Sequence, residues 1–399
     1  MALWQMLSKR NDPVSQADAG ETTDMEAVYD SFVSRKVLLI IILVIAVAVI
    51  AGISLTINSM GLSFFECYEY IIKHVLGYEY EFRSVDWNND YLLWTIYFPR
   101  IVLGIIVGAG LAACGVAMQS LMNNPLADPY TVGISDGACF GAVSAIVTGL
   151  SLSSMTQSMG IVTNAFIMGL VPAVVIILLS RMVRLTPATA ILIGVALSYI
   201  FSGLETMVMV STDAETLKEA YLWQIGTLDG TRWDDCTLPF IFTALSSIFL
   251  MVCSRNLNLL SLGDDSATSL GLNVDQFRTV CMILVSICVA AIVSFCGVIG
   301  FVGLVAPHIV RMLIGGDNRF VIPASMAAGA LFILIADLLS RTLIAPEELR
   351  VGVIVSVIGA PFFLYVILSK KKGYGDEFRC LRYCRNWKLI IVIRSTGSV

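Results

Sequence analysis

The chain has 399 residues and a net charge of −5, and 57% of its residues are hydrophobic while only 14% are charged. Its mean hydropathy is +0.84, whereas a soluble domain has roughly 25% charged residues. This composition excludes a soluble enzyme, a secreted disulfide scaffold and a nucleic-acid-binding protein, none of which can solvate so much apolar surface. We therefore expect an all-α membrane protein.

The first 36 residues are polar and acidic and precede the first long apolar run. That run, 37–57, is too long for the apolar core of a cleavable signal peptide. We predict a cytoplasmic N-terminal leader over residues 1–36.

Apolar runs of about twenty residues, the length that spans a bilayer, recur from Val37 almost to Ser369. Small residues within them, such as Gly104 and Gly108, allow helix backbones to approach closely. We predict one bundle of ten transmembrane helices in the domain 37–372, followed by a cytoplasmic tail over 373–399. The predicted spans are 37–57, 101–122, 131–150, 161–182, 188–210, 237–253, 279–297, 298–314, 321–344 and 351–369.

Basic residues are distributed unequally between the two sides that this alternation of spans defines. With the N-terminus inside, the inner loops and tails carry 18 Lys and Arg residues and the outer segments carry 7. Cytoplasmic segments are typically enriched in these residues. We therefore expect both termini in the cytoplasm.

A short motif recurs in the two halves of the chain. Cys114-Gly115-Val116 precedes Pro125 at the same spacing as Cys296-Gly297-Val298 precedes Pro307. Since five spans separate the copies, the chain direction is reversed between them, as in transporters built from inverted repeats. The bundle could therefore consist of two inverted five-helix halves, although matches this short also arise by chance.

The connection between the second and third spans contains two prolines, in the sequence Asn-Asn-Pro-Leu-Ala-Asp-Pro at 123–129. Proline removes a backbone donor and disfavours helix in the residue before it, so the helix must be interrupted here. The interruption is either an ordinary turn or the inner mouth of a pore.

The loop 259–272 combines acidic with apolar residues. Its pattern is typical of a short amphipathic helix capped by Asp264 and ended by Gly271. An apolar patch in an exposed loop usually marks contact with a protein or a membrane surface, and the alternative is a solvated loop. The apolar residues concerned are Leu262, Ala267, Leu270 and Leu272.

Histidines and cysteines give little indication of a metal site. His74 and His308 are isolated in the sequence, and Cys380 and Cys384 lack a second pair of ligands at the spacing of a zinc site. We predict no metal site.

A third stretch, 300–311, reads Gly-Phe-Val-Gly-Leu-Val-Ala-Pro-His-Ile-Val-Arg. Together with 123–129 and 259–272, in this order and spacing, it resembles the FecCD-type permease family. Members of that family are membrane subunits of ATP-driven importers for iron–siderophore complexes, haem and cobalamin. The resemblance runs from about Phe98 to Lys372, with the first span also in place, whereas the N-terminal leader and the segment after Lys372 depart from the family pattern.

The resemblance implies the fold of a type II ABC importer permease, with ten helices per subunit in a homodimer in the cell membrane. ATP and Mg would bind two separate ATPase subunits on the cytoplasmic side, and this chain, which has no G-x-x-x-x-G-K-[ST] phosphate loop, would not be an enzyme. An extracytoplasmic binding protein would deliver the metal chelate. The residues expected to contact the ATPase are Leu262, Gly263, Asp264, Ala267, Leu270, Gly271 and Leu272.

An inner gate is expected where the interrupted connection approaches the dimer axis. Asn124 and Leu126 would meet Thr186 and Thr189, which precede or begin the fifth span. The alternative is ordinary turn packing, because interrupted spans are common in transport proteins.

The resemblance also implies that arginines at the outer surface pair with acidic residues of the binding protein. The candidates are Arg100, Arg341 and, as a weaker third, Arg350. Alternatively each arginine extends to the membrane interface or pairs locally, Arg341 with Asp337.

An ion-coupled secondary transporter is the alternative function, because inverted repeats and broken helices occur there as well. Ionisable residues inside the membrane would be its sign. A membrane-embedded enzyme is disfavoured, since the chain has no H-E-x-x-H motif. The ionisable candidates are Glu205, Asp136, Asp337 and Arg311.

Overall fold

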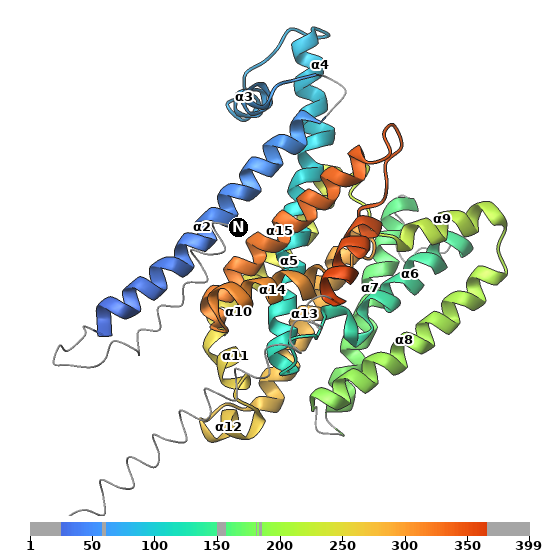
Figure 1. Ribbon diagram of the computed structural model, residues 1–399. Helices are drawn as coiled ribbons and strands as arrows, with labels where there is room; N and C mark the ends of the chain where they lie inside the picture. The colour runs from blue at the N-terminus through green and yellow to red at the C-terminus, as the bar shows by residue number, and fades with distance from the viewer. Residues whose placement is uncertain (1–24, 58–60, 150–156, 181, 183–185, 365–399) are drawn as a thin grey trace, which may run out of the picture.

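The computed structural model describes residues 25–57, 61–149, 157–180, 182 and 186–364 (Figure 1). Within these ranges the structure consists of helices, turns and one isolated bridge between Ile225 and Val298, which confirms the predicted all-α fold. Residues 1–24 of the predicted leader and the whole predicted tail, 373–399, lie outside the described residues. The domain boundaries therefore stay predictions.

Short connections join the helices along the chain, and Figure 1 shows α2 at one edge of the bundle and α8 at the opposite edge. η2 is a π-helical turn that joins α4 to α5, and η3 is a 3-10 turn. The helices are α2 (Met25–Thr56), α3 (Phe64–Val75), α4 (Val85–Leu92), η2 (Leu93–Tyr97), α5 (Phe98–Leu121), η3 (Pro129–Val132), α6 (Ile134–Thr148), α7 (Gln157–Ser180), α8 (Pro187–Val210), α9 (Ala214–Gln224), α10 (Trp233–Val252), α11 (Ser254–Leu260), α12 (Asp264–Ser269), α13 (Val274–Cys296), α14 (Val302–Ile314), α15 (Asn318–Thr342) and a last helix, Val351–Leu364.

Each of the ten predicted spans overlaps one apolar helix, but the helices differ in length. Seven are long and apolar enough to cross a membrane, and α6, α14 and Val351–Leu364 are shorter. α14 has 13 residues, which makes it about 20 Å long, whereas the hydrocarbon core is about 30 Å thick. The predicted positions are confirmed, but ten full-length spans are not found in the part of the chain that the structure describes.

Two of the short helices begin after irregular backbone that lies against other helices. α6 follows the segment 122–133, in which Pro129 lies against Gly303 of α14. α14 follows the turn 297–301, in which Gly297 and Phe301 have positive φ. Irregular backbone is tolerated at membrane depth where protein covers it. The predicted division between two spans near Gly297 is confirmed.

The two copies of the Cys-Gly-Val motif occupy different local structures. Cys114-Gly115-Val116 lies in the middle of α5, whereas Cys296 ends α13 and Gly297 begins a turn. The motif therefore does not mark equivalent positions, and the inverted five-helix halves stay a prediction.

α5 is the central helix of the bundle, and nearly all of its side chains are buried. Gly108 packs against the backbone of Gly329 and Ala330 in α15, and Gly115 packs against that of Gly303 in α14. Such small residues allow membrane helices to approach closely. α5 therefore fixes the positions of α14 and α15.

We expect Gly115→Ala to destabilise the protein, because the added Cβ would overlap the carbonyl group of Gly303. Overpacking of this kind costs about 1–3 kcal/mol. Thermal unfolding of the purified protein in detergent measures the effect. Gly203→Ala in α8 is the matched control, since a Cβ there meets no atom within 4 Å. Equal melting temperatures for the two variants would contradict the importance of this contact.

Candidate functional site

The residues predicted to couple the ATPase lie at the end of the bundle that carries α11 and α12. The two short helices are joined at Gly263, whose φ is 98°, and α12 is followed by Gly271, whose φ is 90°. Glycine adopts this left-handed region without steric cost. The predicted short helix between Asp264 and Gly271 is confirmed as α12, but its N-cap is Gly263, and Asp264 is its first residue.

The apolar residues of this loop divide between the bundle and the surface. Leu262 and Leu270 are 64% and 62% exposed, whereas Ala267 is fully buried and Leu272 packs against the core. Ala267 therefore holds α12 against the bundle, and the expectation that it lies exposed in a wet loop is wrong. Leu262 and Leu270 form the apolar surface that remains for a partner.

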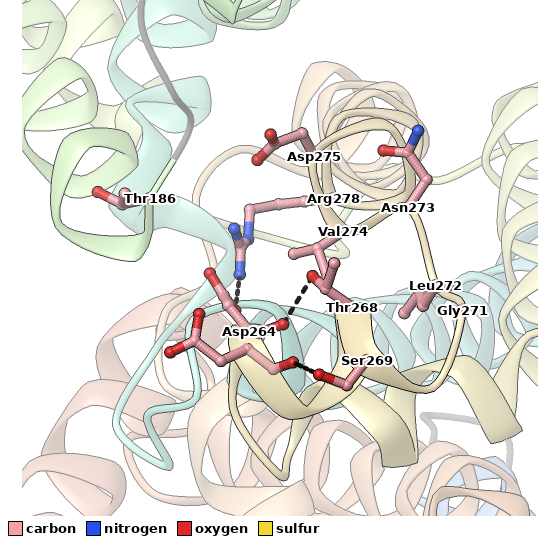
Figure 2. Close-up of a pocket in the computed structure, with 11 residues that line it drawn as sticks. Thr186, Asp264, Thr268, Ser269, Gly271, Leu272, Asn273, Val274, Asp275 and Arg278 are labelled. Atoms are coloured by element: carbon pink, nitrogen blue, oxygen red, sulfur yellow. Dashed lines mark hydrogen bonds and ion pairs between the residues drawn. The ribbon is translucent and has the colours of Figure 1, made fainter.

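Arg278 of α13 attaches α12 to the core (Figure 2). It is 1% exposed, and its guanidinium donates to Oδ1 of Asp264 at 2.7 Å and to the carbonyl of Leu121 at 3.2 Å. Leu121 ends α5, and the carbonyl groups at a helix C-terminus attract a cation. One side chain thus joins α12, α13 and α5. This role of Arg278 could not be predicted from a local pattern, since 157 residues separate it from Leu121.

α11 is held at the same end by the start of α15. The side chain of Asn258 donates to Oδ1 of Asp317 at 2.8 Å, and its oxygen accepts the N–H of Asn318 at 2.8 Å. Burial would raise the pKa of Asp317, but hydrogen bonds from Arg319 and Asn258 outweigh burial and lower that pKa to about 2. A lowered pKa stabilises the fold above the unfolded value of about 4, and this contribution is lost as the pH falls toward 2. The contact is therefore intact at neutral pH.

A cavity of about 930 Å³ lies beside α12 (Figure 2). Three carboxylates, those of Asp264, Asp265 and Asp275, line it together with Arg278. Thr186, at the start of α8, lines it as well, so the structure brings one predicted gate residue to the predicted coupling loop. An acidic hollow beside two exposed leucines suits a protein partner that presents basic and apolar groups.

The four predicted gate residues lie in two segments with local hydrogen bonds. Asn124 accepts the N–H of Leu126 at 3.0 Å through its side-chain oxygen, and Leu126 is exposed. Thr186 caps α8 by accepting the N–H of Thr189 at 3.2 Å. These bonds shape the two turns. Leu126 and Thr186 are exposed, and a gate formed by these residues between two subunits stays a prediction.

The arginines predicted for docking lie at the opposite end of the bundle, and two of them are buried. Arg100 donates to Asp337 at 2.9 Å and to Glu348 at 2.7 Å. Arg341 lies 3.2 Å from Asp337 and donates to the carbonyl of Ser54 at 3.2 Å. Local pairing of Arg341 with Asp337, the alternative from the sequence, is therefore observed. The network joins α2, α5, α15 and the loop 343–350.

Arg350, the third docking candidate, is half-buried. It lines a cavity of about 320 Å³ together with Asp229 and Glu348. Asp229 lies 3.6 Å from Arg100, so this cavity adjoins the buried arginine network.

Two more of the ionisable residues considered for ion coupling, Arg311 and Asp136, form hydrogen bonds with polar side chains. Arg311 of α14 donates to the side chain of Asn318 at 3.0 Å, which links α14 to α15. Asp136 of α6 accepts a hydrogen bond from Ser198 of α8 at 2.5 Å. Glu205 is half-buried on α8.

We expect Arg278→Gln to loosen α12, because the bond to the Asp264 carboxylate is lost. A hydrogen bond to a charged group contributes about 2 kcal/mol, so amide exchange in 264–272 should become roughly thirtyfold faster. Hydrogen–deuterium exchange with mass spectrometry measures this. Arg255→Gln, at an exposed position of α11, is the control, and an equal change in both variants would argue against an anchoring role for Arg278.

The chain is similar in sequence to known transport permeases. The family model of the FecCD transport family matches residues 38–369. The chain is 37% identical over 300 residues to the hemin transport system permease protein of Yersinia pestis, covering 73% of this chain and 89% of the relative. It is 38% identical over 281 residues to the cobalamin import system permease protein of Halobacterium salinarum, covering 70% and 74%. It is 32% identical over 336 residues to the Fe(3+)-citrate import system permease protein of Bacillus subtilis, covering 84% and 95%.

A solved structure has the same fold. It is an inward-facing conformation of an ABC transporter assigned to the metal-chelate type, with a TM-score of 0.72 and 30% sequence identity, covering 83% of this chain and 98% of that chain. The family resemblance of the three motifs is thereby confirmed. The chain is a membrane-spanning transport permease and belongs to the FecCD transport family.

Proposed function

We propose that this chain is the permease subunit of an ATP-binding-cassette importer that moves a metal chelate into the cell by ATP-driven alternating access. The cargo class is an iron–siderophore complex, haem or cobalamin, in keeping with the names of the relatives. The observation that carries the proposal is the α11–α12 element, which presents Leu262 and Leu270 to a partner and is anchored to the bundle by Arg278.

Two ATPase subunits are the proposed partners at this end, and ATP and Mg bind to them. A force on α12 reaches the end of α5 through the bonds of Arg278 to Asp264 and to the carbonyl of Leu121. The interrupted segment 122–133 follows directly. The ATPase can therefore act on the proposed gate without touching it.

A second copy of the chain is the proposed partner for α8. This helix buries only three of its residues, Ala190, Gly194 and Phe201, among those that the structure describes. Exposed apolar side chains recur along its remaining surface, and a homodimer would cover part of them. Thr186 and Thr189 begin α8 and would then lie near the dimer axis with Asn124 and Leu126. The exposed apolar residues are Leu192, Val195, Tyr199, Ile200, Leu204, Met207 and Val210.

We assign the α12 end to the cytoplasm of a cell-membrane protein, with both chain termini on that side. The excess of basic residues in the segments of this side supports the assignment. The end that carries Arg100 and Arg350 then faces an extracytoplasmic binding protein. Because Arg100 and Arg341 are buried in ion pairs, we propose Arg350 as the arginine that meets an acidic residue of that partner.

We expect ATP-dependent uptake when the chain and its cognate ATPase are reconstituted in liposomes with the binding protein. Ferric siderophores, haem and cobalamin are the cargoes to compare. Leu270→Glu should weaken ATPase binding at least about fivefold, since the loss of a central apolar contact costs more than about 1 kcal/mol, and uptake should fall with it. Leu270→Met is the matched control, because it keeps an apolar side chain of similar volume.

The same liposomes separate the importer from an ion-coupled transporter. Uptake that follows an ion gradient without ATP, and is lost in Glu205→Gln, would overturn the proposal. Normal uptake and ATPase binding by Leu270→Glu would refute the coupling assignment while leaving the importer class intact.

For docking, we expect Arg350→Glu to slow association of the binding protein about tenfold at low salt and less at high salt, because exposed charge pairs mainly accelerate encounter and are screened by ions. Stopped-flow measurements at two salt concentrations provide the rates. Lys218→Glu makes the same charge change at an exposed position of α9. Equal rates for the two variants would contradict the assignment of Arg350.

A further inference from the structure

α3 lies at the end of the bundle opposite α12, and Figure 1 shows it nearly end-on, across the direction of α4 and α5. α4, η2 and α5 form one helical segment of 37 residues, Val85–Leu121, which is about 55 Å long. The hydrocarbon core is only about 30 Å thick. The α4 part therefore stands outside the hydrocarbon, with α3 beside it.

One side of α3 packs on the end of α2. The thiol of Cys67 donates to the carbonyl of Leu55 at 3.6 Å, and the hydroxyl of Tyr68 donates to the carbonyl of Ala48 at 2.6 Å. Ala48 lies seven residues before Leu55, which is about 10 Å deeper along α2. The side of α3 that carries Tyr68 therefore points toward the middle of the membrane.

Another side of α3 packs against α4. The hydroxyl of Tyr70 donates to Asp86 at 2.6 Å, and Nδ1 of His74 lies 2.7 Å from a carboxylate oxygen of Asp90. Because α4 extends away from the spans, this side of α3 points away from the membrane.

The remaining surface of α3 is divided into an apolar stripe and a charged stripe. Phe65, Ile72 and Leu76 repeat at helical spacing and form the apolar stripe, in which Phe65 is 81% and Leu76 78% exposed. At 100° per residue this stripe adjoins the side of Tyr68. The charged stripe adjoins the α4 side and consists of Glu66, Glu69 and Lys73.

The helix on which α3 packs, α2, also exposes apolar side chains. Leu38, Ile42 and Ile45 are all more than half exposed along that helix, as expected for a span that faces lipid. α3 thus packs on the end of a helix that faces lipid, and its charged stripe lies on the edge farther from the membrane.

We propose that α3 is an interfacial helix that binds the surface of the bilayer, with its apolar stripe at the boundary between headgroups and acyl chains. Three aspects fit this site: its orientation across the spans, the direction given by Tyr68, and exposed Tyr78 in the turn that follows α3, since aromatic residues are enriched at this depth. Acidic residues on the charged stripe favour zwitterionic over anionic lipid. Because Cys67 and Tyr68 bind α2, this contact sets the depth of α2.

The test places a fluorescent probe on each stripe of the full chain in nanodiscs of phosphatidylcholine. Ile72→Cys and Leu76→Cys carry the probe on the apolar stripe, and Glu66→Cys carries it on the charged stripe. The background replaces Cys253, Cys380 and Cys384 by Ser, because the other seven cysteines are buried. Each variant must keep the gel-filtration profile of the parent.

Quenching by a nitroxide attached to lipid is compared with quenching by iodide in the water. We expect the probes at 72 and 76 to be quenched several-fold more by the nitroxide, and the probe at 66 to show the reverse. Equal iodide quenching at all three positions would place the apolar stripe in water and overturn the proposal. Protection of 72 and 76 from both quenchers would indicate a protein partner, such as a second copy, and would overturn it as well.

Discussion

Gly108 and Gly115 allow α5 to lie with its backbone against α15 and α14, and the other helices are arranged around that packing. Lipid chains are as apolar as leucine, so helices in a membrane gain little by burying apolar side chains and associate through close contact instead. A glycine removes the side chain that would hold two backbones apart. The central position of α5 therefore follows from its small residues. Its apolar content alone does not explain that position, because a helix that faces lipid is equally apolar.

Because α5 is fixed along its length, both of its ends can hold charged side chains in defined positions. Arg100 at one end binds Asp337 and Glu348, and the carbonyl of Leu121 at the other end binds Arg278. A buried guanidinium is costly unless its donors are satisfied, so each arginine specifies where the elements that supply its acceptors must lie. One helix thus connects the surface proposed for the binding protein with the surface proposed for the ATPase.

The spans, the family and the short helix that begins at Asp264 could be predicted from the sequence, because apolar runs, rare motifs and helix-ending glycines are local signals. The burial of Ala267 could not, since a short helix shows which residues are apolar but not which of them meets a neighbouring helix. The partners of Arg100 are 237 and 248 residues away, beyond any local pattern. The pairing of Asp337 with Arg341 could be predicted, because four residues separate them on one helix.

An ion-coupled mechanism needs a carboxylate in the membrane whose charge changes during the cycle. Asp337 is already engaged in two ion pairs, because the guanidinium groups of Arg100 and Arg341 lie 2.9 and 3.2 Å from its oxygens. Its network instead holds α2, α5 and α15 together. Asp136 and Glu205 differ from Asp337 in their position in the bundle. They lie on the neighbouring helices α6 and α8, and α8 carries the face proposed for the second copy. Polar groups there suit the lining of a path for a large polar chelate, which must be solvated in passing without being held.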